Sequence, residues 1–249
     1  RLNSLGLVVW QKQIPYLNNG LSSDAFKDII ETTDGGFLLT GASTRDGLFV
    51  KINGDGSLAW RNSIISSSVD ITAVTEGAAA YYLAGNFTNL SNDFTENFIA
   101  KANKSNGDVE WIKWISFAGT VPMTAVTEYE FDQMNYRNGV IALSGNTRPG
   151  YAGNNKNAQI VLYVDESANV ISAARMENAR IATDPANIFH GQLYDPFTKA
   201  GVQFHNNDSS DYYVYRLKND NTVMWAWRVE MPGAQSANDL KVLYDSSVV

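Results

Sequence analysis

The chain has 249 residues, of which 44% are hydrophobic and 18% charged, a balance that is ordinary for a globular protein and argues against disorder. Its net charge of −7, with the 19 Lys and Arg residues scattered singly, argues against a nucleic acid partner, which is bound through clustered cations. It has no cysteine, which excludes disulfides, thiolate metal ligands and a Cys nucleophile. No apolar run approaches the roughly 18 residues of a membrane-spanning helix.

In chain order, the first expected element is a single strand at 5–14, and the last is another at 236–244. The chain opens without Met on RLNSLGLVVW, so we expect a mature or truncated segment of a longer protein. Between these strands lie four copies of a repeat with a period of about 50 residues. The expected copies cover 23–64, 68–116, 121–178 and 181–231.

Each copy is marked by a Trp that follows a turn residue by four positions. The turn residue is Gly or Asn, the types that tolerate the positive φ of a tight hairpin. A second marker is a glycine inside a short apolar strand, as in FLLTGAS at 37–43. The Trp positions are Trp10, Trp60, Trp111, Trp225 and a substituted Ala173, and the turn residues before them are Gly6, Gly56, Gly107, Asn221 and Asn169.

The first copy divides into four short strands, at 23–33, 36–43, 47–53 and 57–64, separated by turns rich in Asp and Gly. Four short strands in a unit of this period predict an all-β fold, a β-propeller of four-stranded antiparallel blades in one domain or segment, with an incomplete ring. A β-sandwich is the alternative, but sandwiches do not repeat one hairpin at a fixed period. We expect the Trp to cover the neighbouring blade.

The stretch TTDGGFLLTG followed by DGLFVKINGDGSLAW resembles the blade repeats of secreted bacterial β-propellers. It is also similar to the tryptophan-docking repeat of quinoprotein-like (PQQ-like) propellers. The resemblance is strongest for 23–64 and 95–116, and the later copies depart from it at Ala173 and His205. It implies the fold and, as one alternative, a quinone-dependent dehydrogenase, whose set of Arg, Asp, Asn and metal cannot be assembled from this sequence.

The sequence offers little for catalysis or for metal binding. His190 and His205 stand outside any zinc or triad spacing, which favours structural roles for both. Asn53, Asp55 and Ser57 share the alternate spacing of calcium loops but lack the carboxylates that complete one, so a hairpin turn is favoured. We therefore expect no catalytic residue, no metal and no cofactor.

Aromatic residues in the longer hairpins are the predicted binding contacts, with small structural cores under those hairpins as the alternative. Four Asn-x-Ser/Thr sequons are candidate glycosylation sites, two of them in the polar stretch 85–97, which we expect to be an exposed loop. The aromatic set is Tyr129, Phe131, Tyr136, Phe189, Tyr194 and Phe197, and the sequon set is Asn86, Asn89, Asn103 and Asn207.

From the sequence, the favoured function is a non-enzymatic structural or interaction module of a larger secreted or cell-surface assembly. Its loops would bind other protein subunits or glycans. Abundant Asn, Ser and Gly with few Lys favour an extracellular or cell-surface location. The alternatives are a carbohydrate-binding propeller and, less favoured, the quinone-dependent enzyme; a fold of this kind does not decide between them.

Overall fold

In the computed structural model the described residues are 1–14, 24–43, 46–65, 68–89, 94–115, 129–147, 158–177, 190–204, 211–218 and 223–230. The chain divides into two compact units, Arg1–Ile115 and Ser116–Val249. Within the described stretches the long regular elements are all β-strands, and none of these stretches contains a helix long and apolar enough to cross a membrane.

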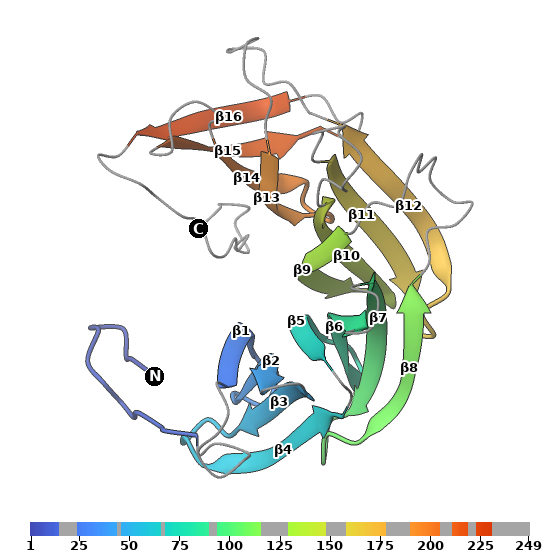
Figure 1. The fold of residues 1–249 in the computed structure, drawn as a ribbon. Coiled ribbons are helices and arrows are strands. Elements are labelled where there is room, and N and C mark those ends of the chain that lie inside the picture. Colours follow the sequence, from blue (N-terminus) through green and yellow to red (C-terminus); the bar gives the residue numbers. More distant parts are fainter. Residues whose placement is uncertain are drawn as a thin grey trace. The chain divides into compact units, whose positions relative to one another are not determined.

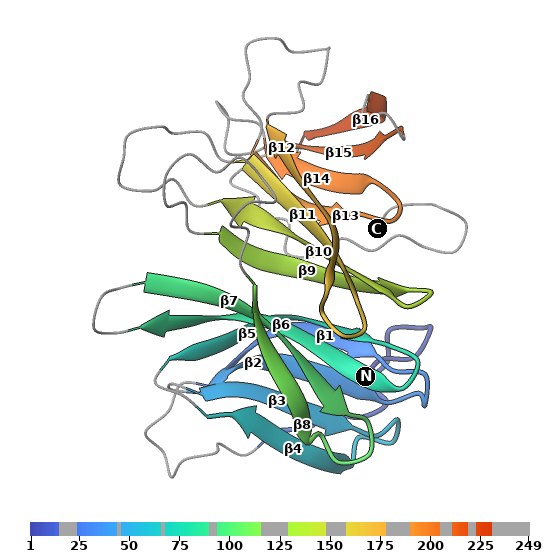
Figure 2. The same ribbon diagram turned by 90° about the vertical axis from the view of Figure 1, so that its right-hand side faces the viewer.

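The strands form four antiparallel sheets of four strands each, and every sheet keeps its strands in chain order (Figures 1 and 2). This confirms the predicted all-β fold of propeller-type, four-stranded antiparallel blades. The strands of unit 1 are β1 Asp24–Glu31, β2 Phe37–Ser43, β3 Asp46–Ile52, β4 Leu58–Ile64, β5 Val69–Glu76, β6 Ala80–Asn89, β7 Phe94–Asn103 and β8 Val109–Ile115. Those of unit 2 are β9 Tyr129–Arg137, β10 Val140–Thr147, β11 Ala158–Asp165, β12 Val170–Glu177, β13 His190–Asp195, β14 Ala200–Phe204, β15 Asp211–Leu217 and β16 Val223–Glu230.

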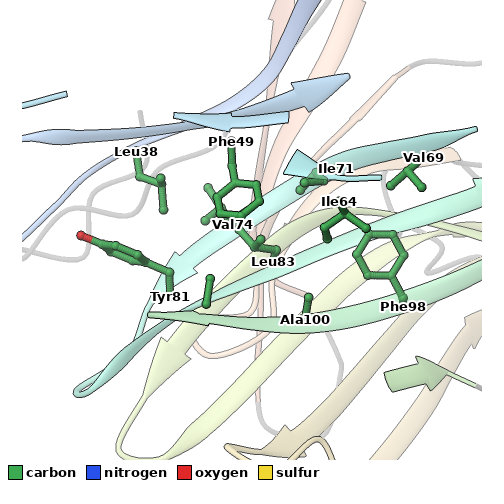
Figure 3. Close-up of a cluster of buried hydrophobic side chains, with 11 residues drawn as sticks. Leu38, Phe49, Ile64, Val69, Ile71, Val74, Tyr81, Leu83, Phe98 and Ala100 are labelled. Carbon is green, nitrogen blue, oxygen red and sulfur yellow. The ribbon is translucent and has the colours of Figure 1, made fainter. Parts of the chain in front are cut away.

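The core of unit 1 lies between the first sheet (β1–β4) and the second (β5–β8). Phe49 of β3 is fully buried and is directed toward Val74 and Leu83 of the second sheet (Figure 3). The inner strands β6 and β7 of the second sheet are buried on both faces, which explains why their sequences run as largely apolar stretches. Beside the core, Asp28 of β1 accepts a hydrogen bond from the backbone N–H of Val74 at 2.9 Å, joining β1 to β5.

The repeated Trp joins one sheet to the next, as the repeat predicts. The Trp60 indole donates to the carbonyl of Lys104 at 3.2 Å and packs near the rings of Phe49 and Tyr81. Its ring also lies so close to Gly107 that a Cβ there would come within 2.6 Å of it. Gly107 therefore serves twice, because its φ of +75° closes the turn and its missing side chain makes room for the indole.

The structure corrects the repeat alignment in the third copy by one residue. Tyr163 pairs with Ser172 at the register position where Lys51 pairs with Trp60, so Ser172 and not Ala173 replaces the Trp. The positive φ of that turn, +57°, belongs to Ala168 and not to Asn169. The third turn has the same length as the first, since Val164 pairs with Val170 as Ile52 pairs with Leu58, and without a Trp to mark it the sequence does not reveal its position.

Candidate functional site

The first strand of each sheet is an edge strand and contains a β-bulge at the same place. In β1 the residue opposite the bulge is Gly41, and in β5 it is Gly85; a Cβ on either would collide with the carbonyl oxygen of Ala25 or of Asp70. Bulges re-aim side chains and are common beside functional sites. In the fourth sheet the glycine is on the bulged strand itself, since Gly191 pairs with Gln203, and His205, predicted at this marker position, lies outside the described residues. The extra residues in the four bulges are all polar: Lys27, Thr72, Asp132 and Gln192.

Beside the bulge of β5, three polar residues stand in one row across the second sheet, which we call the polar row. Asp70 of β5 pairs with Asn86 of β6, and Asn86 pairs with Asn97 of β7. Directly opposed residues share one face of a sheet, with Cβ atoms roughly 4.5–5.5 Å apart. A carboxylate and two amides therefore stand side by side on strands that are separated in the sequence.

The negative charge of Asp70 in the polar row is balanced by the positive charge of Lys27, so this edge of the sheet is polar but neutral. Lys27 Nζ, from the bulge of β1, lies 3.4 Å from Asp70 Oδ2, and the two side chains are 48% and 27% exposed. Asp70 Oδ1 is buried and has no hydrogen-bond partner among the described residues. An unpaired buried carboxylate oxygen is costly, and it points to a donor that a ligand or a water molecule supplies.

A second carboxylate lies close by but is committed to the backbone. Asp28 accepts hydrogen bonds from the N–H groups of Ile29, at 2.7 Å, and of Val74, at 2.9 Å, one on each oxygen. It therefore ties β1 to β5 instead of presenting a free oxygen. Asp70, by contrast, keeps one oxygen without a hydrogen-bond partner among the described residues.

The third sheet repeats the pattern at the corresponding register. Glu130 of β9 pairs with Asn146 of β10, which pairs with Gln159 of β11. The first sheet has Ala25, Ala42 and Gly47 at the same positions and so has no such row. Residues of these types are thus paired in the second and third sheets and not in every copy of the repeat.

The structure describes three of the six predicted aromatic contacts in detail. Phe131 is buried at 1% exposure, which fits the alternative of a small structural core. Tyr136 donates its hydroxyl to Glu166 at 2.8 Å, and Phe197 packs edge-on against Tyr163. A binding role for the set stays a prediction. Phe189 lies outside the described residues, and for Tyr129 and Tyr194 only the strand positions are described.

Two of the four sequons, at Asn86 and Asn89, lie in a strand and not in the exposed loop that the sequence predicts. The stretch 85–97 is not one exposed loop, because β6 continues to Asn89 and β7 begins at Phe94. Asn86 is half-buried in the polar row, and Asn103 Oδ1 accepts from the N–H and hydroxyl of Ser105 in its turn. Asn207 lies outside the described residues. Occupancy of the sequons stays a prediction.

Asn53, Asp55 and Ser57, whose spacing resembles that of a calcium loop, stabilise a turn through hydrogen bonds with one another. Asp55 Oδ1 accepts from both the N–H and the hydroxyl of Ser57, and Asn53 donates to the same hydroxyl, so the calcium-like spacing builds a hairpin turn. Among the described residues no three His, Cys, Asp or Glu side chains gather as metal ligands. His190 opens β13, whereas His205 is outside the described residues.

Comparisons with known proteins bear on the fold. No family model and no curated protein sequence matches the chain. One similar solved structure is a mutant GH32 beta-fructofuranosidase from Bombyx mori in complex with sucrose, at 8% identity and a TM-score of 0.45, over 82% of this chain and 49% of that one. Another is a GH43 endo-arabinanase from Bacillus licheniformis, at 9% identity and a TM-score of 0.27, over 88% and 94% of the two chains. The matched part of this chain spans about half the length of the first of these enzymes.

These matches correct two predictions. Both matched proteins are propeller-fold glycoside hydrolases, so the predicted non-enzymatic structural or interaction module is contradicted, and so is the prediction that the chain is not an enzyme. Sequence reasoning went wrong here because it scored motifs local to one loop, and it found no such motif. At this identity the likeness concerns the fold and assigns no activity to the chain.

Sequence reasoning also missed the polar row. Its members are far apart along the chain, and each looks like an ordinary strand residue. One signal was present, since the marker YYLAGNF at 81–87 puts Asn directly after the glycine that faces the bulge, as does VIALSGNT at 140–147. The first copy, FLLTGAS, has Ala there.

Proposed function

We propose that the protein is a carbohydrate-binding propeller whose sugar site in unit 1 is the polar row with Lys27. The observation that carries this proposal is the buried, unpartnered Oδ1 of Asp70, beside an ammonium group and two amides. A sugar hydroxyl donates to that oxygen, and a neighbouring hydroxyl accepts from Lys27. Two vicinal hydroxyls match an adjacent acceptor and donor, as small-ligand sites with a few placed polar groups require.

The charge of the site favours a neutral ligand over an ion. Asp70 and Lys27 already neutralise each other. The Asp70 carboxylate therefore repels a bound phosphate, and the Lys27 ammonium repels a bound cation. Asn86 and Asn97 add amide groups to this surrounding, although Asn97 is buried and both residues already make interactions within the chain. A polyhydroxylated neutral molecule is the ligand class that suits the adjacent acceptor and donor of Asp70 and Lys27.

The test is a screen of neutral oligosaccharides, followed by titration calorimetry with the best ligand on the variants Asp70→Asn and Glu31→Gln. Asp70→Asn keeps the shape but removes the charge and one acceptor, so we expect at least about tenfold weaker binding, or about 1.4 kcal/mol. Glu31→Gln is the matched control, an exposed carboxylate at the end of the strand that holds Lys27, and it leaves the affinity unchanged. Equal effects of the two changes, or no ligand in the screen, contradict the proposal.

The same samples are assayed for release of reducing sugar, because both matched structures are hydrolases. Glycoside hydrolysis generally uses two carboxyl groups in different roles. Asp70 is the candidate for one of them in unit 1, and Asp28, with both oxygens bonded to the backbone, is not the other. Tyr129→Ala and Tyr194→Ala form a separate arm, and a loss of affinity in these variants alone moves the site to the hairpins predicted from the sequence.

A further inference from the structure

The first and second sheets each have a face built from the same register positions. Another sheet packs on this face in the second sheet, whereas in the first sheet part of it is exposed. On the second sheet, Ile71, Val74 and Leu83 are buried at 0–1% exposure beneath the first sheet. At the corresponding register positions the first sheet has Phe26, Ile29 and Leu39, and Phe26 and Ile29 are 41% and 57% exposed. We call this surface the β1–β3 face; its side chains are Phe26, Ile29, Phe37, Leu39, Val50 and Ile52.

Part of the missing cover is already present at the N-terminus. Residues 1–10 form a hairpin in which Leu2 pairs with Val8, just as Ile52 pairs with Leu58. The φ of Gly6 in its turn is +76°, and that of Gly56 is +86°. Residues 1–14 therefore reproduce the end of the third strand, the turn and the fourth strand of a blade.

This hairpin docks on the first sheet as β3–β4 docks on the second. Trp10 donates to the carbonyl of Gly54 at 3.0 Å, as Trp60 donates to that of Lys104, and both acceptors lie 44 residues further along the chain. The Trp10 ring lies against Gly56, as the Trp60 ring lies against Gly107. Ile14 packs on the inner strands at the position, four residues after the Trp, that Ile64 holds in the next copy.

The N-terminal hairpin covers only part of the β1–β3 face. The rest of that face lies where the first three strands of a blade would pack. A cavity of about 490 Å³ lies between the hairpin and the β1–β3 face, lined by Trp10, Ile14, Phe37, Leu39 and others. On the second sheet the corresponding space is filled by Leu38 of β2 and Phe49 of β3, both fully buried. Two large apolar side chains, one from each of two adjacent strands, therefore fit the cavity.

We propose that the β1–β3 face is a docking surface for three antiparallel strands of the chain's own repeat type, which complete a blade with residues 1–14 as its hairpin. The occupant presents apolar side chains equivalent to Leu38 and Phe49 toward Leu39 and Ile52. A complete blade of a second copy does not fit, because Trp10 and Ile14 already hold the positions of its last strand. Two observations support this occupant: the face is built at the same register positions as the packed interface of sheets one and two, and its side chains Phe26 and Ile29 are exposed.

The test adds a copy of residues 22–50 directly before Arg1 of the full chain. Since Arg1 corresponds to Lys51, the added third strand continues in register into the hairpin. We expect loss of binding of the apolar dye bis-ANS, a blue shift of tryptophan emission, and slowed amide exchange across β1–β2. The control carries Leu38→Asp and Phe49→Asp in the added copy only, and it leaves all three readouts as in the unextended chain.

A second measurement uses the unextended chain, so that failure of the extended chain to fold does not decide the matter. Ile29→Asp removes part of the β1–β3 face at an exposed site and lowers bis-ANS binding. Ile65→Asp, at 82% exposure and outside the face, does not. The proposal is overturned if the extended chain folds without losing dye binding, if its Asp control behaves in the same way, or if Ile29→Asp and Ile65→Asp have equal effects. Concentration-dependent association that Ile29→Asp abolishes would instead identify a second copy as the occupant and also overturn it.

Discussion

Replacing Trp60 by Ala tests how strongly the repeated Trp holds neighbouring sheets together. The indole lies against Phe49 of its own sheet, with ring centroids 5.9 Å apart, and against Tyr81 of the next, at 6.1 Å. It also donates a hydrogen bond to Lys104 and covers Gly107. Its removal leaves a hole between two sheets whose backbones cannot close together.

The expected magnitude follows from these contacts. Truncation of a buried Trp to Ala costs about 3–5 kcal/mol, and loss of a partner for a carbonyl adds about 1 kcal/mol. Because Trp60 is only half-buried, the low end of this range applies, and we expect about 3 kcal/mol. Trp114 is the matched control, since it is 57% exposed and rests on Phe87 and Phe98, so Trp114→Ala costs about 1 kcal/mol.

The assay is urea unfolding followed by far-UV circular dichroism, which does not depend on the removed fluorophore. We expect the midpoint of Trp60→Ala to fall well below that of Trp114→Ala. Equal losses in the two variants, or a loss under about 1 kcal/mol at Trp60, would refute the idea that this Trp locks adjacent blades.

Two further predictions concern the turns. Gly107→Ala destabilises the protein more than Gly35→Ala, because both need φ near +75° but only Gly107 also faces an indole; comparison of their melting temperatures checks this, and equal shifts would contradict it. A hydrogen bond from the Thr32 hydroxyl and another from Lys51 hold the pKa of Asp34 at about 2, below its ordinary 3.8. Since this pKa is depressed on folding, the contribution of Asp34 to stability is present above pH 3.8 and is lost as the pH falls toward 2. Urea titrations should therefore show a larger loss of stability between pH 3.8 and 2 in the wild type than in Asp34→Asn.

The sequence alone determined the strands and their grouping in fours. Turn residues and apolar runs act locally, so FVKINGDGSLAW at 49–60 and its near-copies each specify their own hairpin. Even the N-terminal hairpin, with strand pairing limited to Leu2 and Val8, keeps the same turn. The class of fold was therefore readable before any contact was known.

The tertiary structure decided which residues oppose one another. A bulge shifts the register by one residue, and the third copy has no Trp to mark its position, so spacings alone placed the third Trp site on Ala173 instead of Ser172. The polar row exists because pairing brings Asp70, Asn86 and Asn97 onto one face. No local pattern encodes that meeting, since it depends on long-range strand pairing and on which faces another sheet covers.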